Sequence, residues 1–78
     1  MIDWIKLAEE YEQEAEQLEE NIRRKEAIVA DHTQPLSHRV KAGQILSSLR
    51  SMRIDVLCTA RTMRENARYL EERKKETG

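Results

Sequence analysis

The sequence predicts an all-α protein, an antiparallel helical hairpin built from two long helices. Charged residues make up 37% of the 78 residues and aromatic residues only 4%, a composition typical of long helices. The chain has two glycines and one proline, so few residues are suited to strands and tight turns. Apolar residues recur at alternating spacings of three and four on both sides of the proline. We therefore expect one domain over residues 1–78 with two amphipathic helices.

The first helix is expected over residues 3–31. Asp3 is suited to cap its N-terminus, because a carboxylate can accept hydrogen bonds from the free amides of the first turn. An apolar stripe, interrupted at Lys25, then occupies an arc of about 80° on a helical wheel. We interpret Trp4 and Tyr11 within it as packing residues rather than as groups that stack on a ligand. The stripe consists of Trp4, Ala8, Tyr11, Ala15, Leu18, Ile22 and Val29.

A short loop over residues 32–35 and a second helix over residues 35–75 are expected next. Pro35 disfavours helical geometry at the residue before it and is suited to the first position of a helix. An interior glycine costs up to about 1 kcal/mol relative to alanine, so a kink or break near Gly43 is the alternative. Residues 76–78 are expected to fray. The second apolar stripe, also within about 80°, consists of Ile45, Leu49, Met52, Val56, Met63, Ala67 and Leu70.

The chain holds more apolar residues than two helices can bury against each other. A helix in a hairpin buries one stripe, and a core of this size is marginal for a monomer. Outside the two stripes lie Ile5, Ile28, Leu46, Ile54 and Leu57. We therefore expect a homo-oligomer, most simply a two-fold homodimer that forms a four-helix bundle. The predicted self-association and partner-binding residues are Trp4, Tyr11, Leu18, Met52, Val56, Met63, Ala67 and Leu70.

The C-terminal part of the second helix is predicted to extend past the first. Counting equal lengths back from the loop places Met63 opposite Trp4. Ala67 and Leu70 would then continue the apolar stripe with no cover from the same chain. Residues 63–75 are therefore a predicted docking site for another protein or for a second copy of the chain.

The two halves of the chain carry opposite charge. Residues 1–31 hold ten acids and four bases, and residues 32–78 hold five acids and ten bases, although the net charge is only −1. Pairing with glutamates of the first helix is the favoured role for the arginines of the second. Contact with RNA or DNA, or with an acidic protein partner, is the alternative. Five arginines share an arc of about 80°, namely Arg50, Arg53, Arg61, Arg64 and Arg68.

A nucleic-acid role has three observations against it. The isoelectric point of about 6.1 is low for a nucleic-acid-binding domain. The acids of the first helix would lie beside any bound strand and repel it. The arginine stripe contains no aromatic residue on which a base could stack.

Nothing in the sequence specifies a reaction or a ligand. His32 and His38 are the only histidines, and with Asp31 they are better explained as solvated loop groups than as metal ligands. Cys58 lies far from both histidines, so no base is placed to activate its thiol. We therefore expect a non-enzymatic interaction or assembly module with no metal, no cofactor and no small-molecule substrate.

The expected compartment is the cytoplasm. A single cysteine cannot form an internal disulfide, and the chain begins without the pattern of a signal peptide. No apolar run approaches the roughly 20 residues needed to span a bilayer. An acidic first helix would also be repelled by anionic lipid, so we expect no membrane binding.

Overall fold

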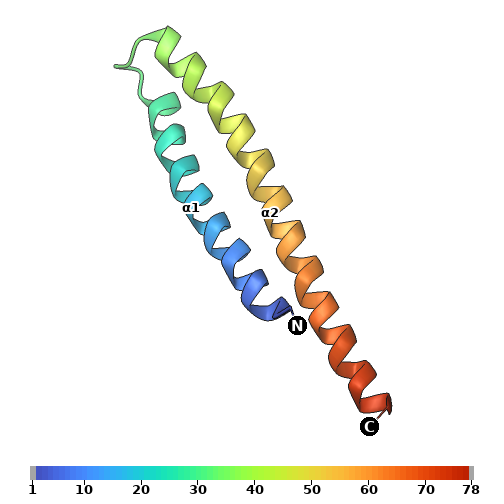
Figure 1. Cartoon of the computed structure of the whole chain (residues 1–78). Coiled ribbons are helices and arrows are strands. Elements are labelled where there is room, and N and C mark those ends of the chain that lie inside the picture. The colour runs from blue at the N-terminus through green and yellow to red at the C-terminus, as the bar shows by residue number, and fades with distance from the viewer. Residues whose placement is uncertain (1, 78) are drawn as a thin grey trace.

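A computed structural model describes residues 2–77, with side chains through residue 75. It has two helices, α1 (Trp4–Ala30) and α2 (Leu36–Thr77), which lie side by side and run in opposite directions (Figure 1). Residues 31–35 connect them. The predicted antiparallel helical hairpin is confirmed, and residues 2–77 include no strand.

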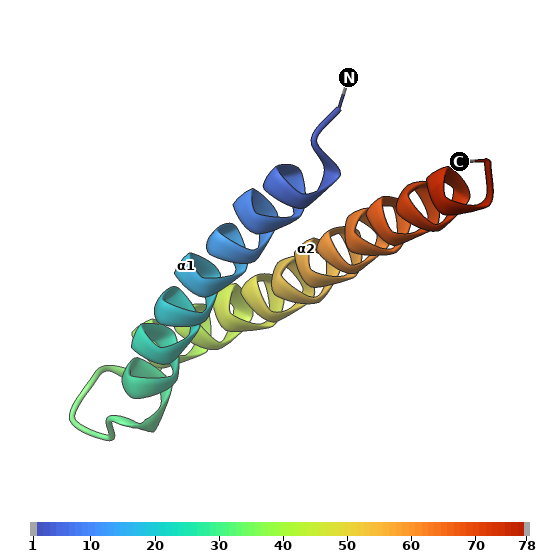
Figure 2. The same cartoon turned by 90° about the horizontal axis from the view of Figure 1, so that it is seen from below.

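The length of α2 sets the length of the molecule. A helix of 42 residues spans about 63 Å, and the hairpin measures 64 × 17 × 14 Å. Figure 1 shows α2 continuing past the N-terminus of α1, and Figure 2 shows the two helices crossing at a shallow angle. Neither helix contains an apolar stretch that could cross a lipid bilayer.

Local hydrogen bonds fix both ends of α1. The Asp3 carboxylate accepts a hydrogen bond from the Lys6 amide at 3.0 Å, so Asp3 caps the helix as predicted. At the other end the backbone leaves helical geometry at Asp31. The Arg39 side chain then donates from Nε to the carbonyl oxygen of Val29 at 2.9 Å. This bond satisfies one of the carbonyls that a helix C-terminus leaves without a partner.

The loop is held by Asp31. Its Oδ1 accepts hydrogen bonds from the amide of Thr33 at 3.0 Å and from the Thr33 hydroxyl at 2.6 Å. These bonds, the hydroxyl bond first, lower the pKa of Asp31 below its ordinary value. The Arg39 amide donates to the carbonyl oxygen of Pro35 at 3.1 Å, so Pro35 precedes the first helical residue, Leu36. The helix therefore begins one residue later than predicted.

The alternative of a break near Gly43 is wrong, because α2 is one continuous helix from Leu36 to Thr77. Gly43 has no positive φ. Ala42 and Leu46, on either side of it, are buried, and this packing offsets the cost of an interior glycine. The helix also includes two residues of the predicted frayed tail, while Gly78 lies outside the described residues.

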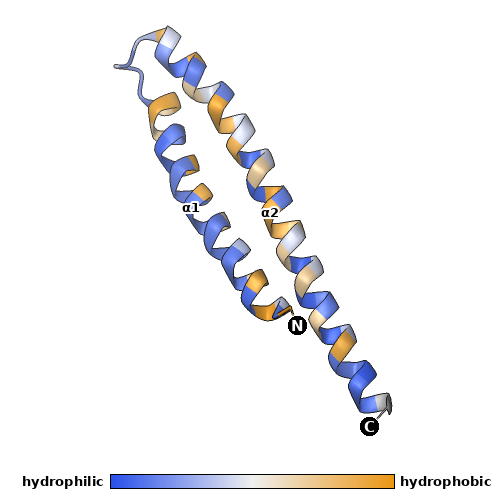
Figure 3. Cartoon of the chain, viewed as in Figure 1, coloured by the Kyte–Doolittle hydropathy of each residue, from blue (hydrophilic) through white to orange (hydrophobic). Residues whose placement is uncertain are grey.

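The core between the helices is narrow and rich in alanine. The buried apolar residues of the described chain are Ala8, Ala15, Leu18, Ile22, Ala42, Leu46 and Ala60. Most of the larger apolar side chains are half-buried or exposed. Figure 3 shows α1 as mostly hydrophilic, with short hydrophobic stretches at intervals. The hairpin therefore buries little apolar volume within one chain.

Replacing Gly43 with alanine should stabilise the hairpin by about 0.5–1 kcal/mol, because it lowers the conformational entropy of the unfolded chain. A Cβ atom at this position would lie 3.9 Å from Cγ2 of Val29, an ordinary contact. Urea unfolding at one fixed protein concentration measures the change, with Ser47→Ala on the exposed side of α2 as the control. A less stable Gly43→Ala variant would show that the close approach to α1 requires glycine.

Candidate functional site

The apolar stripe predicted for α2 is only partly covered by α1. Leu49, Val56, Met63 and Ala67 are half-buried in the described structure. The other three members, Ile45, Met52 and Leu70, are exposed. They are displaced to one side of the contact with α1. The predicted stripe is therefore shared between the hairpin interface and solvent.

The core residues of α2 lie at the edge of that stripe away from Ile45, Met52 and Leu70. Ala42, Leu46 and Ala60 are buried, although Leu46 was predicted to lie outside the main seam. The signal that could have found them is the regular spacing of three and four along α2. This spacing includes the charged residue Arg53, so a pattern of apolar residues alone does not reveal it. The repeat consists of residues 39, 42, 46, 49, 53, 56, 60, 63 and 67.

The residues predicted to mediate self-association have three different environments. Leu18 is buried in the hairpin core. Met52 and Leu70 are exposed, with 49% and 45% of their surface accessible. The others are half-buried, namely Trp4, Tyr11, Val56, Met63 and Ala67.

One side of the hairpin presents a continuous apolar surface. From Ile45 to Leu70 this side of α2 carries no charged residue. Leu7 and Tyr11 lie on the adjoining side of α1, because they are turned away from Glu12 on the helical wheel by about 100–140°. We call this set the apolar surface: Ile45, Leu49, Met52, Val56, Met63 and Leu70 of α2 with Leu7 and Tyr11 of α1.

The other side of the hairpin is held by ion pairs. Arg64 makes a forked contact with Glu12, from Nε at 2.8 Å and from Nη2 at 2.6 Å. Arg50 donates to Glu26 at 3.0 Å. Both pairs link α2 to α1 and fix the level at which the two helices face each other. Both are solvent-exposed, so they determine register more than stability.

The remaining arginines of the predicted stripe have different surroundings. Arg61 pairs with Glu65 within α2 at 3.3 Å. Arg53 is half-buried, and its Nε is buried with no hydrogen-bond partner in the described structure. Arg68 is exposed. Three of the five predicted arginines therefore contact carboxylates of the same chain.

The forked contact shifts the titration of both partners. The hydrogen bonds from Arg64 lower the pKa of Glu12 below its ordinary value of 4.5, and the positive charge of Arg64 adds to this effect. The same contact raises the pKa of the Arg64 guanidinium. The pair therefore favours the charged form of both side chains.

At the end of the hairpin away from the loop, α1 covers α2 further toward the C-terminus than predicted. An open groove of about 910 Å³ lies there, and both helices line it, so α1 reaches the level of Ala67 and Leu70. The count from the loop was wrong because the first turn of α2 extends beyond α1. Its apolar residue Leu36 is 72% exposed.

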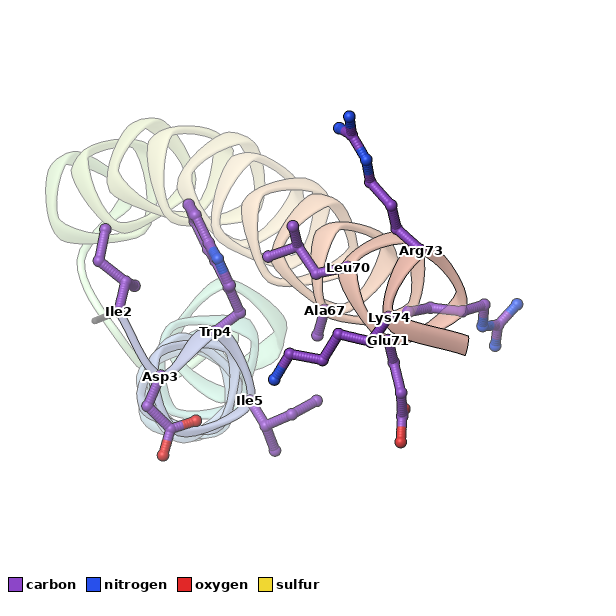
Figure 4. Close-up of a pocket in the computed structure, with 10 residues that line it drawn as sticks. Ile2, Asp3, Trp4, Ile5, Ala67, Leu70, Glu71, Arg73 and Lys74 are labelled. Carbon is purple, nitrogen blue, oxygen red and sulfur yellow. The ribbon is translucent and has the colours of Figure 1, made fainter. Parts of the chain in front are cut away.

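The groove has two differently lined sides. Figure 4 shows Ile2, Trp4 and Leu70 directed to one side of the hairpin, and Asp3, Ile5 and Glu71 to the other. The side with Trp4 and Leu70 is the side of the apolar surface. The apolar surface therefore continues into the groove at the N-terminus of α1.

The histidines, the cysteine and the carboxylates of the described residues do not gather into a metal-binding cluster. No three histidine, cysteine, aspartate or glutamate side chains in residues 2–75 are placed to hold a metal ion. The His38 ring lies 3.1 Å from Oε1 of Gln34, and Cys58 is an exposed thiol. The described residues instead form an apolar surface on one side of the hairpin and ion pairs on the other.

Comparison of the chain with protein-family models, with curated proteins and with solved structures gave no match. The hairpin has an alanine-rich core, and many of its larger apolar side chains lie outside this core.

The ion pair between Glu12 and Arg64 predicts a pH dependence of stability. Because the folded pKa of Glu12 is lowered, its ionised form stabilises the hairpin above the ordinary value of 4.5. That contribution is lost as the pH falls through the lowered folded pKa. Between pH 7 and pH 3, Glu12→Gln should therefore lose less stability than the wild-type chain does.

Urea unfolding at the two pH values measures this difference. Glu16→Gln is the matched control, because Glu16 is exposed on the same helix, one turn from Glu12. It should follow the wild-type chain. Equal losses for Glu12→Gln and the wild-type chain would rule out a role for the forked contact.

Proposed function

We propose that this protein is a non-enzymatic assembly module that self-associates as a homodimer, with two hairpins forming a four-helix bundle. The observation that carries the proposal is the division of its apolar residues. Alanines fill much of the contact between α1 and α2, whereas Ile45, Met52 and Leu70 remain exposed beside it. A second hairpin packed on the apolar surface would bury these larger side chains.

The exposed area of the chain supports this proposal. A compact monomer of 9.2 kDa would expose roughly 4,900 Å², and the hairpin exposes 6332 Å². The excess of about 1,400 Å² is larger than the roughly 800 Å² that each partner buries in a stable complex. One copy of the chain therefore has enough unburied surface to form a dimer interface.

One side of the hairpin is polar and the other is apolar, as a dimer of hairpins requires. The side with the interhelical ion pairs is polar and suited to face solvent. The apolar surface lies on the other side and extends over both helices. Four helices packed around it would form a bundle with a coiled-coil pattern of contacts. Other exposed apolar residues, such as Val40 and Ile54, lie singly and far apart along another side of α2, which is normal for a protein surface.

The nucleic-acid alternative has less support. Arg50 and Arg64 contact carboxylates of α1, so phosphate binding would have to displace those contacts. The proposed setting is the cytoplasm, where the exposed thiol of Cys58 would remain reduced. A protein partner other than a second copy is the remaining candidate for the apolar surface.

The proposal predicts that Met52→Glu converts the dimer to a monomer. Burying one such side chain contributes about 1.5–3 kcal/mol, and a two-fold dimer contains it twice, so the dissociation constant should rise by about 100-fold or more. Size-exclusion chromatography with light scattering, over a range of protein concentrations, measures the mass. Absorbance at 260 and 280 nm in the same run detects bound nucleic acid.

Ile54→Glu is the matched control. Ile54 is 59% exposed, close to the value for Met52, and lies two positions away in sequence. The two side chains point about 160° apart on the helix, so Ile54 is outside the apolar surface. The control should remain a dimer. A wild-type chain that is a monomer at every concentration, or equal effects of the two substitutions, would refute the proposal.

A further inference from the structure

The apolar surface allows a second copy to pack in two orientations. In a two-fold symmetric pair of hairpins, each α1 lies either over the partner's α2 or over the partner's α1. The first arrangement places both loops at the same end of the bundle, and the second places them at opposite ends. Apolar contacts distinguish weakly between the two, because the apolar surface includes residues of both helices.

The charges of the two helices differ strongly. From Trp4 to Ala30, α1 holds eight acids and four bases, a net charge of −4. From Leu36 to Thr77, α2 holds five acids and ten bases, a net charge of +5. Neighbouring helices of a bundle lie about 8–10 Å apart, which is within the screening length of about 10 Å at 0.1 M salt. Their net charges therefore act across an interface between two copies.

Most of the acidic residues of α1 have no ion pair with α2 in the described structure. Only Glu12 and Glu26 of α1 have interhelical ion pairs in the described structure. Glu10 and Glu14 are exposed. They lie about 100–140° around α1 from the middle of its contact with α2, and so beside the apolar surface. A neighbouring helix from a second copy would pass close to them.

We infer that the second copy packs with its loop at the same end, so that each acidic α1 lies over the basic α2 of the partner. This inference rests on the proposed self-association. The same-end arrangement places helices of opposite net charge next to each other at both contacts between the copies. The opposite-end arrangement would place α1 over α1 and α2 over α2, so that helices of like net charge lie next to each other at both contacts. Charge then selects the orientation, while the apolar surface supplies the affinity.

A spin-label distance between the two loops tests the orientation. His32 is exposed in the loop. The variant His32→Cys, with Cys58→Ser to remove the native thiol, places one label in each chain. In the same-end arrangement the two labels should lie within about 30 Å, because the loops belong to neighbouring hairpins. In the opposite-end arrangement α1 separates them by about 40 Å or more.

A second label at the other end of the molecule checks the result. Glu72→Cys, again with Cys58→Ser, lies on the exposed part of α2 near the N-terminus of α1. The same-end arrangement predicts short distances for both labels. Light scattering on the labelled samples measures the mass, because the distance is meaningful only for a dimer.

The measured distances and masses test the orientation and the self-association separately. Short distances at both positions in a dimer support the orientation. Distances of about 40 Å or more at both positions in a dimer overturn the orientation and leave the self-association standing. A monomeric mass with no measurable coupling between labels overturns both.

Discussion

The structure depends on one geometric constraint, namely that two helices packed side by side bury only one stripe each. In this chain the stripe of α2 that contacts α1 contains Ala42, Leu46 and Ala60. Alanine side chains let the helices approach closely, but each contributes little buried area. The larger apolar residues lie next to this contact rather than in it. The two helices therefore have a defined arrangement, but the hairpin leaves many of its larger apolar side chains unburied.

Much of the fold follows from local sequence patterns. The apolar spacing, the cap at Asp3 and the proline before α2 predict the two helices and their antiparallel arrangement, which the structure confirms. The covered side of α2 could not be predicted in the same way. Its apolar arc is wide, and α1 contacts one edge of it. A helical wheel locates the centre of an arc, whereas the packing partner decides which edge is buried.

The position of α1 along α2 also could not be predicted from the sequence. Counting residues from the loop assumes that the helices face each other from their first turns. Arg39 instead bonds to the carbonyl of Val29, so the first turn of α2 projects past the end of α1. That offset brings Trp4 to the level of Leu70. For the candidate site, the glutamate partners of Arg50 and Arg64 followed from charge, but the exposure of Met52 required coordinates.

The seven-residue repeat of the α2 contact positions has a consequence for how the helices stay in register. The contact positions of α2 repeat with a period of seven residues, so sliding α2 along α1 by seven residues would restore similar apolar contacts. Arg53 is the charged member near the middle of this repeat, between Leu46 and Ala60. After such a slide its guanidinium would meet different neighbours on α1. Such a slide would also separate Arg64 from Glu12 and Arg50 from Glu26, so the ion pairs between the helices distinguish the native alignment from the shifted ones.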